Sequence, residues 1–283
     1  MFLNLEKVTS EFPNLSNLEL IDRGGQKLVF KCNNPQYGIC ALKLILPEAA
    51  SRLDREIEAV NRLNQTENIP KIYWATQKII DQQLIFFLLE QFIEGQTLHN
   101  ILLNGPIEKE LVLRIANDLT HSIYIMDSNS IAHRDIKPKN IIVDNNGKVW
   151  ILDFGIARIL DLTSKTRDSA LWGPQTPGYG APEQIRNEKT NIDGRTDLFS
   201  TGIVLFECCT GYNPFYSKAT SKHEVFLNVL RKPLPKLDID WDTHYKFQEF
   251  VSSITQKYQF QRPSCAEASK WISEISNALG GDK

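Results

Sequence analysis

The sequence predicts an α+β fold in which strands dominate the N-terminal part of the chain and helices the C-terminal part. Residues 18–46, 71–80 and 84–91 are strand-like and are separated by turn residues or by a helical pattern. Residues 112–126 instead carry apolar side chains at steps of three and four, which indicates a long amphipathic helix. The region after residue 197 is also mainly helical in pattern. Strands and helices are therefore segregated along the chain.

A break in composition, FIEG at residues 92–95, marks the boundary between the two parts. Within the first part, Leu53, Ile57, Val60 and Leu63 form an apolar stripe at helical spacing. We expect three regions: residues 1–91, of which 1–16 form an N-terminal extension, a hinge at 92–95, and residues 96–283.

Composition limits the class of protein. The chain has 283 residues, is 42% hydrophobic and carries a net charge of −2, which gives no reason to expect nucleic acid as a partner. The longest apolar run, residues 84–89, is far too short to span a membrane, and the N-terminus lacks the pattern of a signal peptide. Five cysteines without a C-x-x-C pair predict neither a disulfide framework nor a zinc site. We expect a cytoplasmic protein of undetermined oligomeric state.

The most informative stretch is residues 133–155. It reads HRDIKPKN, an apolar run, a DNNG turn, a second apolar run and DFG. Asn and Gly tolerate positive φ, so the pattern predicts two strands joined by a tight hairpin turn. The open ends of a hairpin lie together, and Asp135, Asn140 and Asp153 should therefore converge. These oxygen ligands, with Lys137 nearby, suit a divalent cation that is also bound to phosphate.

HRDIKPKN and DFG, in this order and separated by a hairpin, resemble the catalytic and metal-binding segments of eukaryotic-type serine/threonine protein kinases. The resemblance implies that Asp135 accepts or orients the proton of the attacking hydroxyl and that Lys137 neutralises the γ-phosphate of ATP. It also implies that Asn140 and Asp153 hold Mg²⁺, with Mn²⁺ as the alternative. A lysine two residues after the aspartate is typical of serine/threonine rather than tyrosine kinases.

Two other positions of this stretch take their expected roles from the same resemblance. Ile142 should form the floor of the adenine pocket. His133 should be structural and pack against the segment that contains Phe154, with no part in the chemistry.

The first strands carry a glycine-containing turn. Residues 22–29 read DRGGQKLV where the kinase pattern is G-x-G-x-x-G-x-V; an aspartate and a lysine replace the outer glycines, and one extra glycine follows the middle one. Taken alone, this is an ordinary hairpin turn. The resemblance implies contacts with the nucleotide from Gly24, Gly25 and Val29, although a loop with side chains should lie less closely on the phosphates.

The next strand reads ICALKLI, and its alternation places Ala41 and Lys43 on one face. A lysine in an apolar row is costly to bury unless it is paired, and one that reaches water from the strand edge is the alternative. CALK resembles the kinase motif V-A-I-K, which implies that Lys43 holds the α- and β-phosphates and that Ala41 packs on adenine. Glu56 lies within the apolar stripe of the following helix, and the resemblance implies that it pairs with Lys43.

The segment LLEQFIEGQTL resembles the linker that joins the two lobes of a kinase. On this basis Leu89 should line the back of the nucleotide pocket. Glu90 should offer its backbone carbonyl, and Phe92 its backbone N–H and carbonyl, to adenine. The residues alone leave open a linker that contacts no ligand.

Residues 156–180 are polar and rich in hydroxyl groups, and they fall where kinases have the activation loop. Arg134, beside Asp135, resembles the arginine that receives a loop phosphate in one kinase subgroup, since phosphate pairs well with guanidinium. A solvated loop with incidental hydroxyls is the alternative. We expect phosphorylation of one or more of Thr163, Ser164, Thr166 and Ser169.

The sequence TPGYGAPE at residues 176–183 resembles the segment that ends a kinase activation loop. Thr176 should be a positioning or regulatory hydroxyl near the aspartate and the lysine of HRDIK. Glu183 should form a buried ion pair with Arg262. Asp197, at the start of an apolar helix, either caps that helix or, as the resemblance implies, holds the backbone of the HRD segment.

The resemblance spans residues 18–278. It implies a two-lobed protein-kinase-like fold, with an antiparallel sheet and one helix in the N-terminal lobe and a mainly helical C-terminal lobe, and it implies ATP and Mg²⁺ between the lobes. The expected reaction is transfer of the γ-phosphoryl group to Ser or Thr of a protein, the chain itself included. A regulatory pseudokinase, indicated by the altered glycine turn, and a small-molecule kinase are the alternatives.

Overall fold

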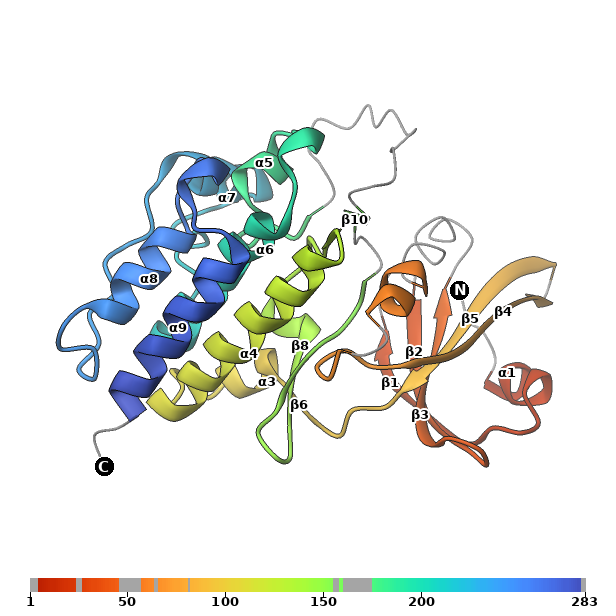
Figure 1. Ribbon diagram of the computed structural model, residues 1–283. Coiled ribbons are helices and arrows are strands. Elements are labelled where there is room, and N and C mark those ends of the chain that lie inside the picture. Colours follow the sequence, from red (N-terminus) through yellow and green to blue (C-terminus); the bar gives the residue numbers. More distant parts are fainter. Residues whose placement is uncertain are drawn as a thin grey trace. The chain divides into compact units, whose positions relative to one another are not determined.

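The computed structural model describes residues 5–23, 27–45, 57–63, 66–80, 82–154, 158–159 and 175–280. The chain divides into two compact units, Met1–Glu94 and Gly95–Lys283. The expected hinge at residues 92–95 includes this boundary. Strands dominate the first unit and helices the second (Figure 1), which confirms the predicted fold class.

The first unit is built on an antiparallel sheet whose described strands have the order β1-β2-β3-β5-β4. Helix α1 (Leu5–Glu11) precedes the sheet, and a helix over residues 57–62 lies between its third and fourth strands in the chain. The strands are β1 (Ser16–Arg23), β2 (Lys27–Asn34), β3 (Gly38–Ile45), β4 (Ile72–Ile80) and β5 (Gln83–Gln91).

The two faces of this sheet have different surroundings. One face forms the main core of the unit, in which Leu42 and Leu89 lie opposite each other on β3 and β5 and pack near Val8 of α1. Because successive side chains of a strand point to opposite faces, Lys43 and Leu88 belong to the other face. Leu88 packs there with Ile57 from the helix over residues 57–62. We call this second face the inner face.

The second unit begins with β6 and is mainly helical. Its helices are α3 (Leu98–Leu102), α4 (Lys109–Ser128), α5 (Pro182–Ile185), α6 (Gly194–Thr210), α7 (Lys222–Arg231), α8 (Lys246–Ile254) and α9 (Cys265–Gly280). Its described residues also include the short 3-10 helices η2 (Pro138–Asn140), η3 (Lys189–Asn191) and η4 (Gln259–Gln261). Figure 1 shows α4 and α9 side by side along much of their length.

Short strands carry the central loops of the second unit. β6 (Gly95–Thr97), β8 (Ile141–Asp144) and β9 (Val149–Ile151) form one small sheet, and β7 (Ile131–Ala132) pairs with β10 (Arg158–Ile159). A Cβ atom at Gly95 would lie 2.3 Å from the carbonyl oxygen of Val143. Only glycine therefore lets β6 come this close to β8.

Helix α6 shows how polar residues set the ends of a buried helix. Asp193 is its N-cap, because its carboxylate accepts a hydrogen bond of 2.8 Å from the backbone N–H of Arg195. Gly211 ends the helix with a φ of 78°, in the left-handed region that glycine adopts without strain. Asp197 lies inside the first turn, so the interpretation of Asp197 as the cap is wrong.

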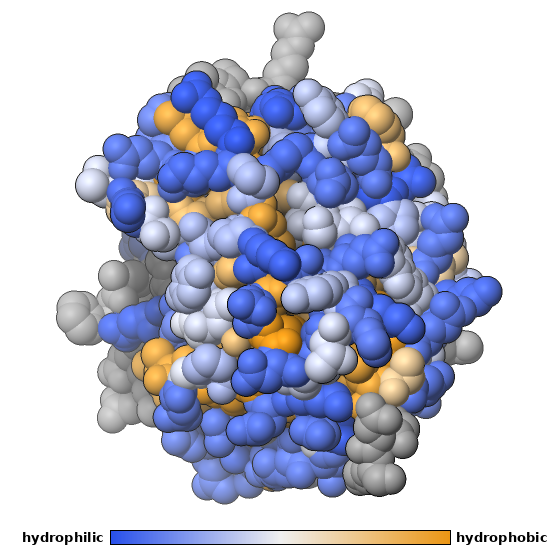
Figure 2. Space-filling view, turned by 90° about the vertical axis from the view of Figure 1, so that its left-hand side faces the viewer, coloured by the Kyte–Doolittle hydropathy of each residue, from blue (hydrophilic) through white to orange (hydrophobic). Residues whose placement is uncertain are grey.

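The surface of the helical unit is ordinary for a globular protein. The face turned to the viewer in Figure 2 is mostly hydrophilic, and its hydrophobic residues form small separate patches. Within the residues that the structure describes, no helix has the length and apolar character needed to cross a lipid bilayer.

Candidate active site

The β8–β9 hairpin brings residues 133–140 and 152–154 together, as the sequence pattern predicts. Ile141 and Ile151 are in register, and just beyond them the N–H of Leu152 donates a hydrogen bond of 2.8 Å to the carbonyl of Asn140. Asp153 follows directly in the chain. This backbone hydrogen bond holds Asn140 and Asp153 beside each other.

Asp135 is the centre of a connected group of polar side chains. Its Oδ2 lies 2.6 Å from Lys137 Nζ and accepts a hydrogen bond of 2.9 Å from Asn140 Nδ2. Its Oδ1 accepts a hydrogen bond of 2.6 Å from the hydroxyl of Thr176, which in turn accepts one of 2.9 Å from Lys137. Both carboxylate oxygens are thereby fixed, and an acceptor of defined orientation lies beside a lysine.

His133 supports this loop through buried contacts. It is fully buried, and its ring packs edge-on against Phe154 with the centroids 4.6 Å apart. Nε2 lies 3.0 Å from the carbonyl of Leu152, and Nδ1 accepts from the N–H of Asp135 at 3.2 Å. These contacts fit a neutral ring that carries its proton on Nε2, and burial lowers the pKa of His133 accordingly. The packing expected from the sequence is present.

Asp197 holds the backbone of the same loop. Its two carboxylate oxygens accept hydrogen bonds of 2.7 Å from the N–H groups of His133 and Arg134. Burial raises the pKa of Asp197 to about 7, while these two donors favour its ionised form. Arg134 has a φ of 72°, and its carbonyl accepts from the side chain of Gln184. The strained backbone of Arg134 is thus held at its N–H by Asp197 and at its carbonyl by Gln184.

Asn140 and Asp153 fit the expected metal site. The Asn140 amide uses its nitrogen to donate to Asp135, which fixes the orientation of its oxygen as a ligand. Asp153 has a φ of 67°, a conformation that non-glycine residues rarely adopt. Across the described ranges, no group of three or more His, Cys, Asp or Glu side chains is arranged around one point. A cation here would share its coordination with phosphate or water, as Mg²⁺ commonly does.

Glu183 and Arg262 form the buried ion pair that the sequence predicts. Arg262 donates two parallel hydrogen bonds to the Glu183 carboxylate, at 2.7 and 2.9 Å, and both side chains are almost fully buried. Thr196 donates a further bond of 2.9 Å to Glu183. The pair fixes the end of the segment that contains Thr176 to the chain between η4 and α9, and Thr196 fixes it to the start of α6.

Several residues that the sequence analysis did not single out complete this segment. The hydroxyl of Tyr179 donates to Glu207 at 2.6 Å, and that of Tyr216 donates to the carbonyl of Pro177 at 3.0 Å. Gln184 accepts from the N–H of Ala181 at 3.1 Å as well as binding the Arg134 carbonyl. Except for Ala181 and Gln184, these partners are far apart in the chain, and no local pattern reveals them.

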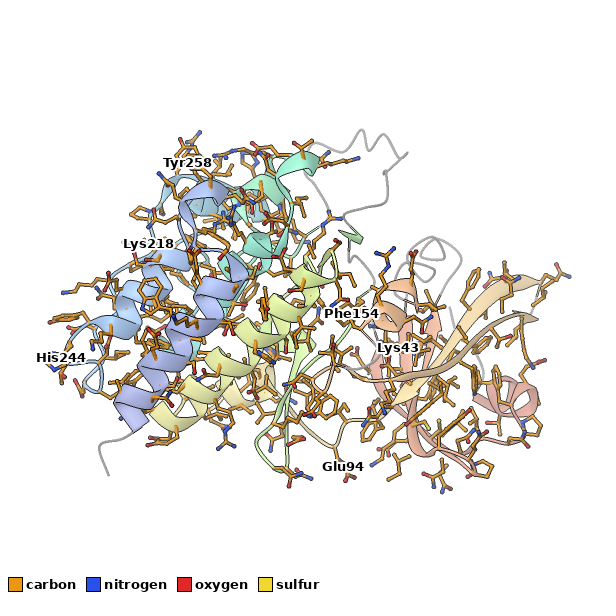
Figure 3. The ribbon with its side chains drawn as sticks, viewed as in Figure 1. Lys43, Glu94, Phe154, Lys218, His244 and Tyr258 are labelled. Atoms are coloured by element: carbon orange, nitrogen blue, oxygen red, sulfur yellow. The ribbon has the colours of Figure 1, made fainter. Side chains whose placement is uncertain are left out.

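In the first unit, the expected nucleotide-binding residues of β2 and β3 share the inner face. Val29 is in register with Lys43, so Val29, Lys43 and Ala41 point the same way. Ala41 is buried, and Lys43 is only 4% exposed. Lys43, labelled in Figure 3, therefore does not reach water from the strand edge; it is a buried charge.

Glu90 is a partner of this lysine. Its Oε2 lies 2.9 Å from Lys43 Nζ, and both side chains are at most one-tenth exposed. Glu90 lies inside β5, in register with Ala41 of β3 and Ile72 of β4. Its side chain therefore lies on the inner face and pairs with Lys43, a contact that the sequence did not predict, while the expected contact of its backbone carbonyl with adenine stays a prediction.

The expectation that Leu89 lines the back of the nucleotide pocket is wrong, because its side chain does not lie on the inner face. Leu89 is one residue before Glu90, so its side chain points to the opposite face and is fully buried in the main core.

Phe92 follows the end of β5, and its ring lies 4.8 Å from Lys31 Nζ. In the second unit, Ile142 of β8 is half-buried between two fully or nearly buried neighbours.

Some predicted site residues lie outside the described residues. They are the glycines of the first turn, the helix glutamate expected to pair with Lys43, and the loop hydroxyls: Gly24, Gly25, Glu56, Thr163, Ser164, Thr166 and Ser169. Their roles stay predictions.

A sheet unit with a buried lysine and a helical unit with the Asp135 cluster on a hairpin together define a protein-kinase-like fold. Residues 15–272 match the family model of the protein kinase domain, so the chain belongs to the protein kinase family.

Its relatives include bacterial proteins that are named serine/threonine-protein kinases. The chain is 34% identical over 214 residues to the probable serine/threonine-protein kinase PknB of Bifidobacterium longum, a match that covers 70% of this chain and 30% of that protein. It is 30% identical over 239 residues to PrkC of Bacillus subtilis (83% and 35%) and 29% identical over 273 residues to pkn3 of Myxococcus xanthus (89% and 48%). The matched region thus spans between 30% and 48% of the length of these relatives.

Proposed function

We propose that this chain is the catalytic domain of a serine/threonine protein kinase, which transfers the γ-phosphoryl group of ATP to Ser or Thr hydroxyls of proteins, itself included. The observation that carries the proposal is the Asp135 cluster. A carboxylate fixed by Asn140 and Thr176 and paired with Lys137 offers an oriented acceptor next to a positive charge. Phosphoryl transfer needs little more from a protein than positioning and charge neutralisation.

Each residue of the cluster then has a separate task. Asp135 orients the attacking hydroxyl and takes up its proton, and Lys137 neutralises charge that develops on the transferred group. Thr176 helps to hold these two side chains in their relative positions through its hydrogen bonds to both. Asn140 and Asp153 would hold Mg²⁺, or Mn²⁺ in its place, and the bound metal would neutralise phosphate charge.

The sheet unit supplies the nucleotide contacts in this proposal. Lys43 binds the α- and β-phosphates, Val29 and Ala41 contact adenine from the inner face, and Phe92 binds it through backbone groups. Ile142 of β8 is a further contact of adenine in this proposal. Glu56 assists Lys43, and Gly24 and Gly25 approach the phosphates.

Regulation is proposed for the loop that follows DFG. Phosphate on Thr163, Ser164, Thr166 or Ser169 would pair with Arg134 and order the loop. Mass spectrometry of active protein, before and after phosphatase treatment, tests this: activity that persists without any phosphate in the loop contradicts it. We place the reaction in the cytoplasm, in keeping with the composition of the chain.

Phosphate transfer from radiolabelled ATP tests the proposed function. We expect wild-type protein with Mg²⁺ to label itself and a generic basic protein on Ser or Thr, and Asp153→Ala and Asp135→Asn to reduce labelling by at least 100-fold. Lys236→Ala, a surface change in the same unit, is the matched control and should keep activity. Binding of ATP without transfer to any protein would instead indicate a pseudokinase. Transfer only to small molecules would indicate a small-molecule kinase.

A further inference from the structure

Lys43, the lysine proposed to bind phosphate, has a buried carboxylate partner on its own sheet, Glu90. The two charged atoms are 2.9 Å apart in a nearly dry environment, and the side chains project diagonally from neighbouring strands of the inner face. A charge pair that is shielded from water is far stronger than one at the surface. A nucleotide phosphate must therefore meet an ammonium group that already has a carboxylate beside it.

The register defines where this carboxylate lies. Glu90 of β5 is opposite Ala41 of β3. Lys43 of β3 is opposite Val29 of β2 on one side and Leu88 of β5 on the other. The carboxylate is thus on the same surface as the residues proposed to contact adenine and the phosphates, only one diagonal step from the lysine. A unit negative charge at this distance weakens the attraction of Lys43 for any further anion.

We infer that Glu90 is a positioning residue that holds Lys43 on the inner face and lowers the affinity of the site for nucleotide phosphates. The inference rests on the proposed function, because it takes Lys43 as the phosphate-binding lysine. An ammonium group has three N–H donors, so Glu90 and a phosphate bind it at the same time. The effect of Glu90 is then electrostatic: it is large for ATP, smaller for ADP and absent for adenosine.

Direct nucleotide binding to the full chain tests this inference. With Glu90→Gln, which removes the charge but keeps the side-chain shape, we expect the dissociation constant of Mg–ATP to fall at least 10-fold. The dissociation constant of adenosine, which has no phosphate, should change less than 2-fold. Glu90→Asp keeps the charge and should remain closer to wild type than Glu90→Gln. A purely structural role of Glu90 would change ATP and adenosine binding alike.

A second acid–lysine pair provides a matched control. Glu11 also lies 2.9 Å from a lysine, Lys78, but this pair is part-exposed. Lys78 is in register with Ile85, a residue of the main core, so it belongs to the face opposite Lys43. Glu11→Gln removes the same charge from the same unit and should leave both dissociation constants unchanged.

The outcomes separate this inference from the proposed function. Suppose that wild-type protein binds ATP. If Glu90→Gln then binds ATP no more tightly than wild type, or if its affinity for adenosine rises as much as its affinity for ATP, Glu90 does not limit phosphate affinity. If neither Glu90→Gln nor Glu90→Met folds even with saturating ATP, the inference also fails, because ATP phosphates should replace the lost charge. Wild-type protein that binds neither ATP nor ADP would contradict the proposed function itself.

Discussion

Thr176 and Asp135 are joined by a hydrogen bond of 2.6 Å, in which the threonine hydroxyl donates to the aspartate although the two residues lie far apart in the chain. The same hydroxyl accepts from Lys137, so one oxygen atom bridges the proposed base and the proposed positive charge, which also contact each other directly at 2.6 Å. The loop that carries Thr176 is in turn fixed by Tyr179, Tyr216 and the Glu183–Arg262 pair. The order of this segment and the geometry of the cluster therefore depend on each other.

Removal of the Thr176 hydroxyl should lower kcat for peptide phosphorylation by about 10- to 100-fold, because small displacements of reacting groups cost this much. Thr176→Ala is the test, and Thr176→Ser, which keeps the hydroxyl, should stay near wild type. Steady-state kinetics with a peptide substrate measure both. Full activity of Thr176→Ala would show that the hydrogen bonds do not contribute to catalysis.

Loss of the Arg262 side chain should destabilise the helical unit by about 3–5 kcal/mol, because it leaves the Glu183 carboxylate buried without its cation. Urea unfolding of Arg262→Ala, followed by circular dichroism, measures this loss. Lys270 provides the control, since it pairs with Glu274 across 3.9 Å while its side chain is 80% exposed. Lys270→Ala should cost less than about 0.5 kcal/mol. Similar losses for the two variants would contradict the role assigned to burial.

The geometry of the Asp135 cluster could be predicted from the sequence to a large extent. The DNNG turn fixes a two-strand hairpin, and a hairpin leaves little freedom in where its open ends meet. Asn140 and Asp153 are adjacent for this reason. The Glu183–Arg262 pair, in contrast, depends on a resemblance, because nothing in the local pattern links two residues that distant in the chain.

The sequence does not determine which face of a sheet a strand residue occupies as firmly as it determines the hairpin. A shift of one residue moves a side chain to the other side of a sheet, so the choice between Leu89 and Glu90 for the inner face depends on strand register. Residues 84–89 are apolar throughout and give no alternation from which to choose. Asp193 and Asp197 present the same problem in a helix: both lie near its start, and only one caps it.

Replacement of Asp197 by asparagine should loosen the HRD loop. An amide can accept from one of the two N–H groups that Asp197 now binds, but its own NH₂ would face the other donor. We expect a loss of about 1–3 kcal/mol in the stability of the helical unit, and a lower kcat with little change in the KM for ATP. A kcat equal to that of wild type would contradict this role.

The same variant should change the pH dependence of stability. Burial raises the pKa of Asp197 from its ordinary value of 3.8 to about 7, so between these values the folded chain keeps a proton that the unfolded chain releases. This contribution to stability is present at low pH and is lost as the pH rises to 7. The stability difference between wild type and Asp197→Asn should therefore shrink from pH 5 to pH 8. A difference that grows over this range would contradict the assignment.

Lys257 should produce the opposite pH dependence at alkaline pH. Its ammonium group donates to the carbonyl of Val229 at 2.6 Å and lies 4.6 Å from the ring centre of Phe215. Burial, and secondarily the charge of Arg262, lowers the pKa of Lys257 from 10.5 to about 8. Between these values the unfolded chain keeps a proton that the folded chain releases, so the contribution of Lys257 to stability rises with pH.

Lys257→Met tests this expectation, because methionine fills a similar volume and does not titrate. Urea unfolding of both proteins at intervals from pH 7 to pH 10 gives the difference in the free energy of unfolding, wild type minus variant. That difference should increase with pH by at most about 3 kcal/mol. Buried tyrosines and cysteines that titrate in the same range are common to both proteins and cancel. A difference that is flat or falls above pH 8 would show that Lys257 stays charged in the folded chain, held by the Phe215 ring and the Val229 carbonyl.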